Sequence, residues 1–133
     1  MNRKPLTVQQ FMTRSPHCID SDSSLLSASK MMHDLDIRHL PVKARGTVAG
    51  ILSQQNVMAA LALPLSGQLG IEDVMVSQPY VVDREADLAE VAHQMASEKF
   101  GSAIIIEDGE IVGIFTTIDA CRALCQILED GGR

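Results

Sequence analysis

The sequence predicts an α+β protein built from two copies of one β-α-β-β-α unit. The first reason is an internal repeat: sliding the chain against itself from Met12 to Met75, an offset of 63 positions, also aligns Leu25 with Leu88, without a gap. The other reasons are a two-residue hairpin signal, Asp108-Gly109, and apolar residues at helical spacing before and after it. A constant offset is typical of two supersecondary units that bury their apolar faces against each other.

Each copy is expected to open with a helical turn and a short strand. Thr7 followed by Gln10 resembles a capping box and predicts a turn at Val8 to Met12, which the second copy repeats at Ile71 to Met75. After a proline, strands are expected around Cys18-Ile19 and around Val81-Val82. Apolar residues at helical spacing then predict a helix in each copy: Leu25, Ala28, Met32 and Leu35 in the first, and Leu88, Val91 and Met95 in the second.

A hairpin and a second helix complete each copy. Ala103 to Glu107 and Glu110 to Phe115 are expected to flank the turn at Asp108-Gly109, and Arg45-Gly46 is the turn of the first copy. The closing helices are expected to begin near Gln54 and Thr117. The repeats then span residues 1–62 and 71–128, with a linker at 63–70 and a frayed C-terminus at 129–133.

Composition and charge restrict the class of protein. With 46% hydrophobic and 3% aromatic residues among 133, the core is expected to be aliphatic and to include methionines. No apolar run is long enough to span a bilayer and no signal peptide is recognisable, so we expect a cytoplasmic protein without a membrane partner. The net charge of −6 argues against nucleic acid. The weakest alternative is a nucleic-acid contact through Arg3, Lys4 and Arg14.

Polar chemistry concentrates where the last strand of each copy meets the last helix. In the second copy, Thr116 is expected at the N-cap, and Asp119 follows three residues later. A helix N-terminus attracts anions through its free N–H groups and its dipole, and a carboxylate accepts hydrogen bonds from both hydroxyls of a ribose. The same spacing is also an ordinary capping pattern, which by itself indicates only that a helix begins.

Together with these junctions, the chain resembles the cystathionine-β-synthase (CBS) domain family, whose domains occur as tandem pairs. The resemblance extends from Val8 to about Leu128. It rests on the order of several short segments: Phe11-Met12-Thr13, Val74-Met75, Ile37-Arg38-His39-Leu40-Pro41-Val42 and the two closing junctions. It implies two repeats packed through their sheets about a pseudo-two-fold axis. It also implies that clefts between the repeats bind adenosine-containing ligands such as AMP, ADP, ATP or S-adenosylmethionine.

The resemblance assigns roles to individual residues. Thr116 corresponds to the hydroxyl residue near ribose and phosphate, and Asp119 to the acidic residue that holds the ribose hydroxyls. Arg38 and His39 correspond to positions where basic side chains meet the phosphates. The adenine is expected beside four further residues: Tyr80, Val81, Ser102 and Ala103.

The two copies differ at these positions. Asn56 replaces the acidic residue in the first copy and lacks the charge and second acceptor oxygen of a carboxylate, so Ser53 and Asn56 are expected to form a weaker second site. In the second copy, Gly101-Ser102 occupies the place of Arg38-His39. The cations and the ribose-binding carboxylate are therefore expected to come from different repeats.

Other kinds of site are not indicated. The four histidines lack the spacing of a zinc site, and the acidic residues lack that of a calcium loop, so we expect no metal. Cys121 and Cys125 lie one helical turn apart, where a buried apolar stripe is expected rather than a metal or redox pair. Arg122 is expected to be an exposed helical arginine, although it could reach a phosphate. No nucleophile is paired with a base, so we expect no enzymatic activity.

These expectations lead to two hypotheses. The first is a stand-alone regulatory, energy-sensing module that requires no cofactor, binds an adenine nucleotide or S-adenosylmethionine, and signals its occupancy to an unknown partner protein or to its own oligomer. The second is a ligand-free dimerisation module, whose closing helices form a homodimer through apolar residues such as Leu61, Leu124 and Leu128. The adenosine part is common to all the candidate ligands, so the sequence leaves the choice among them open.

Overall fold

The computed structural model describes residues 5–131, which form two compact units. One unit consists of residues 17–79. The other combines residues 5–16 with residues 80–131. Arg3 and Lys4, named above as nucleic-acid contacts, and Gly132 and Arg133 of the predicted frayed end lie outside the described residues.

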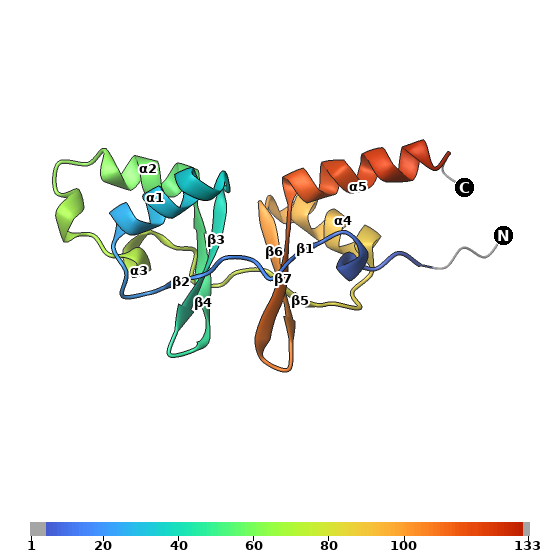
Figure 1. The fold of residues 1–133 in the computed structure, drawn as a ribbon, viewed down its shortest axis with the longest axis horizontal. Helices are drawn as coiled ribbons and strands as arrows, with labels where there is room; N and C mark the ends of the chain where they lie inside the picture. The colour runs from blue at the N-terminus through green and yellow to red at the C-terminus, as the bar shows by residue number, and fades with distance from the viewer. Residues whose placement is uncertain (1–4, 132–133) are drawn as a thin grey trace. The chain divides into compact units, whose positions relative to one another are not determined.

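The unit of residues 17–79 has a three-stranded sheet with its long helices on one face (Figure 1). The sheet order is β2-β3-β4, in which β2 is parallel to β3 and β4 is antiparallel to it. Its elements are β2 (Ile19–Asp20), α1 (Leu25–Leu35), β3 (His39–Ala44), β4 (Thr47–Ser53), α2 (Gln54–Leu61), the 3-10 turn η2 (Ser66–Gln68) and α3 (Ile71–Val74). The predicted β-α-β-β-α order is confirmed for this copy.

The second unit has a four-stranded sheet in the order β1-β7-β6-β5. Its elements are the 3-10 turn η1 (Val8–Gln10), β1 (Thr13–Arg14), β5 (Val81–Asp83), α4 (Leu88–Glu98), β6 (Ser102–Glu107), β7 (Glu110–Thr116) and α5 (Thr117–Glu129). Strands β5 and β6 are parallel, as β2 and β3 are, and β6 and β7 form the second hairpin. The two sequence repeats therefore form strands that pair in the same way.

The opening segment of the chain packs against the second repeat. Strand β1 pairs with β7, with Thr13 opposite Ile114, and the Val8 N–H donates to the carbonyl of Ala86 at 2.9 Å. Val8 is fully buried in the core of this unit. Figure 1 shows the same arrangement, with the blue chain start running beside β7. Residues that begin the first repeat in the sequence therefore complete the sheet of the second repeat.

The start of the second repeat makes the matching contacts in the unit of residues 17–79. Ile71 is fully buried in that core, and Val76 exchanges two backbone hydrogen bonds with Ile51, at 3.0 and 2.9 Å. The two cores are mainly aliphatic and each contains a buried methionine, Met32 in one and Met95 in the other. The composition predicted such cores.

Both hairpin turns have the left-handed backbone that the sequence predicted. Arg45 and Gly46 have φ angles of 53° and 80°, and Asp108 and Gly109 have 53° and 79°. Two successive residues with positive φ form the type I′ turn, whose twist matches that of the flanking strands. The Arg-Gly and Asp-Gly pairs therefore set the register next to each turn, and an irregularity shifts it farther along, between Val42 and Lys43 and between Ile105 and Ile106.

The termini of several elements differ slightly from the prediction. The first turn ends at Gln10 rather than Met12, although the Thr7 N–H does donate to Oε1 of Gln10 at 2.9 Å. Helix α5 includes Glu129, so the regular structure extends one residue into the segment expected to fray. The predicted repeat boundaries at 62 and 71 divide the sequence but not the structure. The opening segment of each repeat packs in the unit formed mainly by the other repeat.

Candidate functional site

The junction of β7 and α5 positions the main candidate residues. Thr116 is the last residue of β7 and the N-cap of α5, with φ −104° and ψ 174°. Its extended backbone turns the chain into the helix, so that Asp119 lies in the first turn of α5. Asp119 is only 5% exposed. A buried carboxylate needs hydrogen-bond partners, and this one has several.

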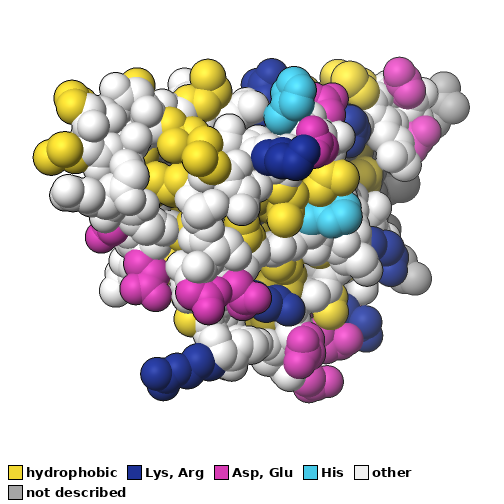
Figure 2. Space-filling view, turned by 60° about the vertical axis from the view of Figure 1, so that its left-hand side comes forward, with side chains coloured by type: hydrophobic (Ala, Val, Ile, Leu, Met, Phe, Trp, Pro, Cys, Tyr) yellow, Lys and Arg dark blue, Asp and Glu magenta, His cyan; other side chains and the backbone are white. Residues whose placement is uncertain are grey.

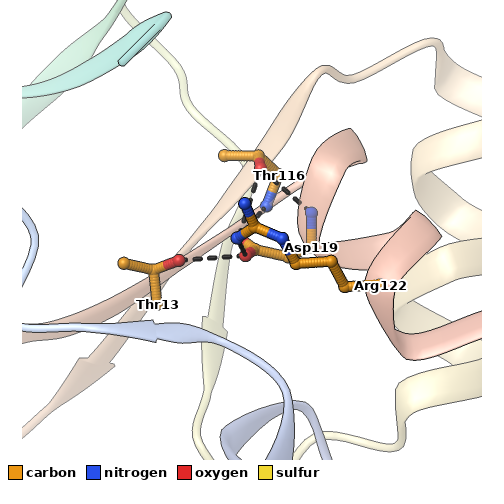
Figure 3. A network of polar contacts seen from close by, with 4 residues as sticks. All are labelled: Thr13, Thr116, Asp119 and Arg122. Carbon is orange, nitrogen blue, oxygen red and sulfur yellow. Dashed lines mark hydrogen bonds and ion pairs between the residues drawn. The ribbon is translucent and has the colours of Figure 1, made fainter. Parts of the chain in front are cut away.

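Asp119 is held by two threonines (Figure 3). Its Oδ2 accepts the Thr116 N–H at 2.9 Å and the Thr116 hydroxyl at 3.1 Å. Its Oδ1 accepts the hydroxyl of Thr13 at 2.9 Å. The Asp119 N–H in turn donates to Oγ1 of Thr116 at 3.3 Å. The carboxylate is fixed in one orientation by Thr13 on β1 and Thr116 on β7.

Arg122 adds a weak ionic contact to this cluster. Its Nη1 lies 3.8 Å from Oδ1 of Asp119, and its side chain is 76% exposed. An exposed pair at this distance contributes at most a few tenths of a kcal/mol. The prediction of an exposed helical arginine is confirmed, and Figure 3 shows its guanidinium beside the carboxylate.

The capping interpretation of Thr116 and Asp119 is confirmed. Their reciprocal bonds form a capping box, and the Thr117 N–H donates to the carbonyl of Gly101 at 3.3 Å. The expectation of free N–H groups at this terminus is corrected accordingly, because those of Thr117 and Asp119 have partners. Ligand binding by Thr116 and Asp119 stays a prediction.

Sequence reasoning missed Thr13 as a member of this cluster. It lies more than a hundred residues before Asp119, and the sequence analysis treated it only as part of an opening segment. The internal repeat does not reveal this pair, because Thr13 belongs to the first copy and aligns with Val76, whereas Asp119 belongs to the second copy and aligns with Asn56. The hydroxyl and the carboxylate come together only because β1 of the first copy pairs with β7 of the second.

The residues predicted to lie beside adenine belong to the same unit. Tyr80 stacks on Phe100 with ring centroids 5.1 Å apart, and its carbonyl accepts the Ile104 N–H at 2.8 Å. Burial, together with the negative charge of Glu90, raises the pKa of the Tyr80 hydroxyl. Val81 is half-buried and pairs with Ile104, while Ser102, opposite Thr116, and Ala103 are buried. Ser102 and Thr116 are thus neighbours on adjacent strands.

Arg38, His39, Ser53 and Asn56 are brought together in the unit of residues 17–79. The Arg38 carbonyl accepts the Gln54 N–H at 2.8 Å, and His39 on β3 is opposite Ser53 on β4. Oγ of Ser53 accepts the Asn56 N–H at 3.2 Å. The predicted cations therefore lie next to the predicted weaker site and in a different unit from Asp119.

His39 differs electrostatically from its neighbour Arg38. Burial lowers the pKa of the His39 imidazole, and the positive charge of Arg38 lowers it further. His39 is therefore neutral at pH 7, because its pKa lies below the ordinary value of 6.5. At this pH Arg38 is the positively charged member of the pair.

Metal-ligand clusters and helices of membrane-spanning length were both sought in the described residues. Within residues 5–131, no three His, Cys, Asp or Glu side chains are grouped so that they could hold a metal ion. No helix in this part of the chain is long and apolar enough to cross a membrane. On the face shown in Figure 2, Lys and Arg side chains are interspersed with Asp and Glu, and hydrophobic side chains reach the surface between them.

Solved structures share this fold over nearly the whole chain. A protein from Vibrio cholerae, named as a candidate acetoin utilization protein (AcuB), is 31% identical, with a TM-score of 0.82 and 95% of each chain covered. CBSX2, solved in complex with AMP, is 27% identical, with a TM-score of 0.79 over 91% of this chain and 97% of that one. The CBS domain pair of protein MJ0100, solved with 5′-methylthioadenosine and S-adenosylmethionine, has a TM-score of 0.84 at 23% identity over 92% and 98%.

Two curated relatives are longer enzymes. A homoserine O-acetyltransferase from Methanocorpusculum labreanum is 25% identical over 115 residues, and an L-aspartate semialdehyde sulfurtransferase from Methanocaldococcus jannaschii is 26% identical over 123 residues. The chain covers 85% and 90% of its own length in these matches but only 23% and 24% of the two enzymes. The family model for the CBS domain matches twice, at residues 1–63 and 71–126. The chain therefore belongs to the CBS domain family and contains a pair of CBS domains.

Proposed function

We propose that this CBS pair is a regulatory module that binds an adenosine-containing ligand and signals its occupancy to a partner protein or to its own oligomer. The candidate ligands are AMP, ADP and ATP, with S-adenosylmethionine as a further one. The observation that carries the proposal is the buried Asp119 carboxylate, held in one orientation at the start of α5. Two proteins with the same fold support it, since CBSX2 binds AMP and MJ0100 binds S-adenosylmethionine.

The carboxylate retains capacity for a ligand hydroxyl. Each carboxylate oxygen can accept two hydrogen bonds, and Oδ1 accepts one short bond, from Thr13. The other group near Oδ1 is the exposed Arg122, whose contact at 3.8 Å is weak enough to be given up. A ribose hydroxyl that donates to Oδ1 would gain a charge-assisted bond in a partly buried setting, worth about 1.5 to 3 kcal/mol.

The choice among the ligands would depend on their phosphate or sulfonium groups, because the adenosine part is shared. Arg38 offers a planar fork of donors that suits phosphate oxygens. His39 adds hydrogen bonding but no charge at pH 7. If Arg38 contacts phosphates, its removal lowers the affinity for AMP, ADP and ATP while leaving that for S-adenosylmethionine nearly unchanged.

Thermal unfolding with added ligands tests the proposal. AMP, ADP, ATP, NAD and S-adenosylmethionine are each added at millimolar concentration to the purified chain. A ligand at a hundred times its Kd stabilises the native state by about 2.7 kcal/mol, which raises Tm by several degrees. A shift with one adenosine compound supports the proposal. No shift with any of them, from folded and ligand-free protein, contradicts it.

Matched substitutions locate the site. Asp119→Ala is expected to abolish the ligand-induced shift, measured from the variant's own Tm, and Asn56→Ala is the control at the equivalent position of the other copy. Persistent binding by Asp119→Ala would show that the ribose is held elsewhere. A second candidate function, pairing with another copy without a ligand, is favoured by the exposed Leu124 and Leu128 of α5, whereas Leu61 of α2 packs against the core of its own unit.

A further inference from the structure

Met12 and Met75, which the internal repeat aligns, each lie against a glycine of a closing strand. A Cβ built on Gly113 would overlap Sδ of Met12, and one built on Gly50 would lie 2.7 Å from Sδ of Met75. Each thioether therefore fills the space that the missing side chain of a glycine leaves open. Both methionines are half-buried and pack against the core of their own unit.

Met12 directly precedes the strand that supports Asp119. Strand β1 is two residues long, and it pairs with β7 with Arg14 opposite Gly113. Thr13, which donates its hydroxyl to Asp119, is the other residue of this strand. So short a strand makes few backbone hydrogen bonds, and the packing of Met12 on Gly113 adds to what holds it in place. Loss of that packing would therefore loosen the support of Asp119.

A thioether in such a contact is sensitive to oxidation. Hydrogen peroxide transfers one oxygen to the sulfur: an S–O bond forms, the O–O bond breaks, the sulfur loses two electrons, and the second oxygen leaves as water. The sulfoxide oxygen is polar and needs a hydrogen-bond donor if it stays buried. Because the methionine side chain is flexible, the sulfoxide of Met12 can turn out to water and leave Gly113 uncovered.

Three other methionines provide references for access and for consequence. Met58 is 59% exposed, so peroxide reaches it, and its sulfoxide stays in water without breaking a core contact. Met32 and Met95 are only 1% and 5% exposed and are shielded by the cores. Met12 combines partial access with a contact that the sulfoxide breaks. Its oxidation is therefore expected to follow that of Met58 and, unlike it, to change the structure.

We propose that Met12 is an oxidation site whose sulfoxide detaches β1 from β7 and thereby releases Thr13 from Asp119. Met75 is the equivalent site of the other unit, where no carboxylate depends on it. Enzymatic reduction of the sulfoxide restores the thioether and its contact. The oxidation state of Met12 is then a reversible control on how firmly Asp119 is held. This inference depends on the packing of Met12 and not on the proposed nucleotide binding.

Peroxide treatment followed by thermal unfolding tests the proposal. The whole chain, with Met75→Leu as background, is treated with millimolar hydrogen peroxide, and peptide mass spectrometry locates the sulfoxides. We expect Tm to fall by about 5 °C as Met12 is oxidised. Adding Met12→Leu is expected to remove most of this fall, measured from the variant's own Tm, whereas the matched control Met58→Leu keeps it. An equal fall with Met12→Leu, or an unmodified Met12 after complete oxidation of Met58, would overturn the proposal.

Thiol oxidation has to be separated from this effect. Cys121 and Cys125 are exposed, so the expectation that they belong to a buried stripe is wrong; the buried residues of α5 are Asp119 and Ala123. Peroxide therefore reaches these thiols, and dithiothreitol is added afterwards to reverse their disulfides and sulfenic acids. Methionine sulfoxide reductases A and B, which act on the two sulfoxide epimers, are then expected to restore Tm. A Tm that stays low after Met12 has been reduced would assign the loss to the thiols and contradict the proposal.

Amide hydrogen exchange, measured by NMR, locates the structural change. The Ser15 N–H donates to the Val112 carbonyl at 3.1 Å, so its exchange rate reports the pairing of β1 with β7. The Ile104 N–H, bonded to the Tyr80 carbonyl at 2.8 Å, is the reference in the same sheet. Oxidation of Met12 is expected to speed exchange at Ser15 at least about tenfold and to leave Ile104 nearly unchanged. Equal acceleration at both amides, or none at Ser15, would refute detachment of β1.

Discussion

The two units share their strand pairing but differ in the polar groups where the last strand meets the last helix. One unit has Thr13, Thr116, Asp119 and Arg122, joined by hydrogen bonds and a weak ion pair. The other has four residues at the equivalent positions: Val76, Ser53, Asn56 and Ala59. There, the Asn56 N–H bonded to Oγ of Ser53 caps the helix. A hydroxyl at the N-cap is thus enough to begin the helix.

The extra groups of the Asp119 unit therefore exceed what the fold requires. Helix α2 begins with Ser53 alone as its cap, while α5 begins with a capping box that contains the buried Asp119 carboxylate and with a second hydroxyl, that of Thr13. The hydrogen bonds of Asp119 largely offset the cost of burying its charge, so the net gain in stability over a simple cap is small, although removing the carboxylate would leave its donors without an acceptor. This difference between the units is the one on which the proposed binding role of Asp119 rests.

The largest predicted effect is the asymmetry between Asp119→Ala and Asn56→Ala. Removing Asp119 leaves the Thr116 N–H and the Thr13 and Thr116 hydroxyls without their acceptor, and we expect a loss of about 2 to 3 kcal/mol. Asn56 is exposed, and its substitution is expected to cost less than about 0.5 kcal/mol. Urea unfolding of the two variants measures the difference. Equal losses would mean that the cluster is only a cap.

A second comparison uses the glycines Gly50 and Gly113, which occupy equivalent positions on β4 and β7. A Cβ at Gly50 would lie 2.6 Å from the Val76 carbonyl oxygen, which is fixed by its bond to Ile51. A Cβ at Gly113 would instead meet the flexible side chain of Met12. We expect Gly50→Ala to cost about 2 kcal/mol and Gly113→Ala about 1 kcal/mol in urea unfolding. The reverse order would show that the backbone at Val76 moves aside for the added methyl group more easily than the side chain of Met12 does.

Many features that the two units share could be predicted from the sequence, because they depend on residues close together in the chain. The turns at Arg45-Gly46 and Asp108-Gly109, the helix starts at Ser53 and Thr116, and the order of elements all follow from short patterns. The same patterns located the capping box that includes Asp119. Local turn chemistry and apolar spacing act within a few residues, so one sequence suffices to identify them.

The remaining features depend on contacts between distant segments. The bond from Thr13 to Asp119 requires the chain start to join the sheet of the second repeat, which no local pattern specifies. The exposure of Cys121 and Cys125 was missed for a related reason. Helical spacing identifies apolar rows, but α5 has one on each side, and only packing decides which row is buried.

A smaller effect is predicted for Thr13→Val, which gives one copy the residue found in the other. The substitution removes the hydroxyl bond to the buried Asp119 carboxylate at nearly constant volume, and we expect a loss of about 1 to 1.5 kcal/mol. Val76→Thr is the control and is expected to leave the stability unchanged. Val76 is 48% exposed, and its unit has Asn56 where the other unit has the carboxylate of Asp119. Thermal unfolding gives the stability term. Calorimetric titration with whichever adenosine compound raises Tm in the ligand test then shows whether a less firmly held carboxylate also lowers the affinity for that compound.

The smallest predicted effect is the pH dependence of stability that comes from His39, in the unit of residues 17–79. His39 has a pKa below its ordinary value of 6.5, from burial and from Arg38, whereas the equivalent residue of the other unit is Ser102. Well above pH 6.5 the His39 imidazole is neutral in both the folded and the unfolded chain, so it does not make the unfolding free energy depend on pH. As the pH falls below 6.5 the unfolded chain binds a proton that the folded chain resists, and stability decreases until the folded pKa is passed. His39→Ser should flatten this part of the profile of unfolding free energy, and an unchanged slope would place the responsible group elsewhere.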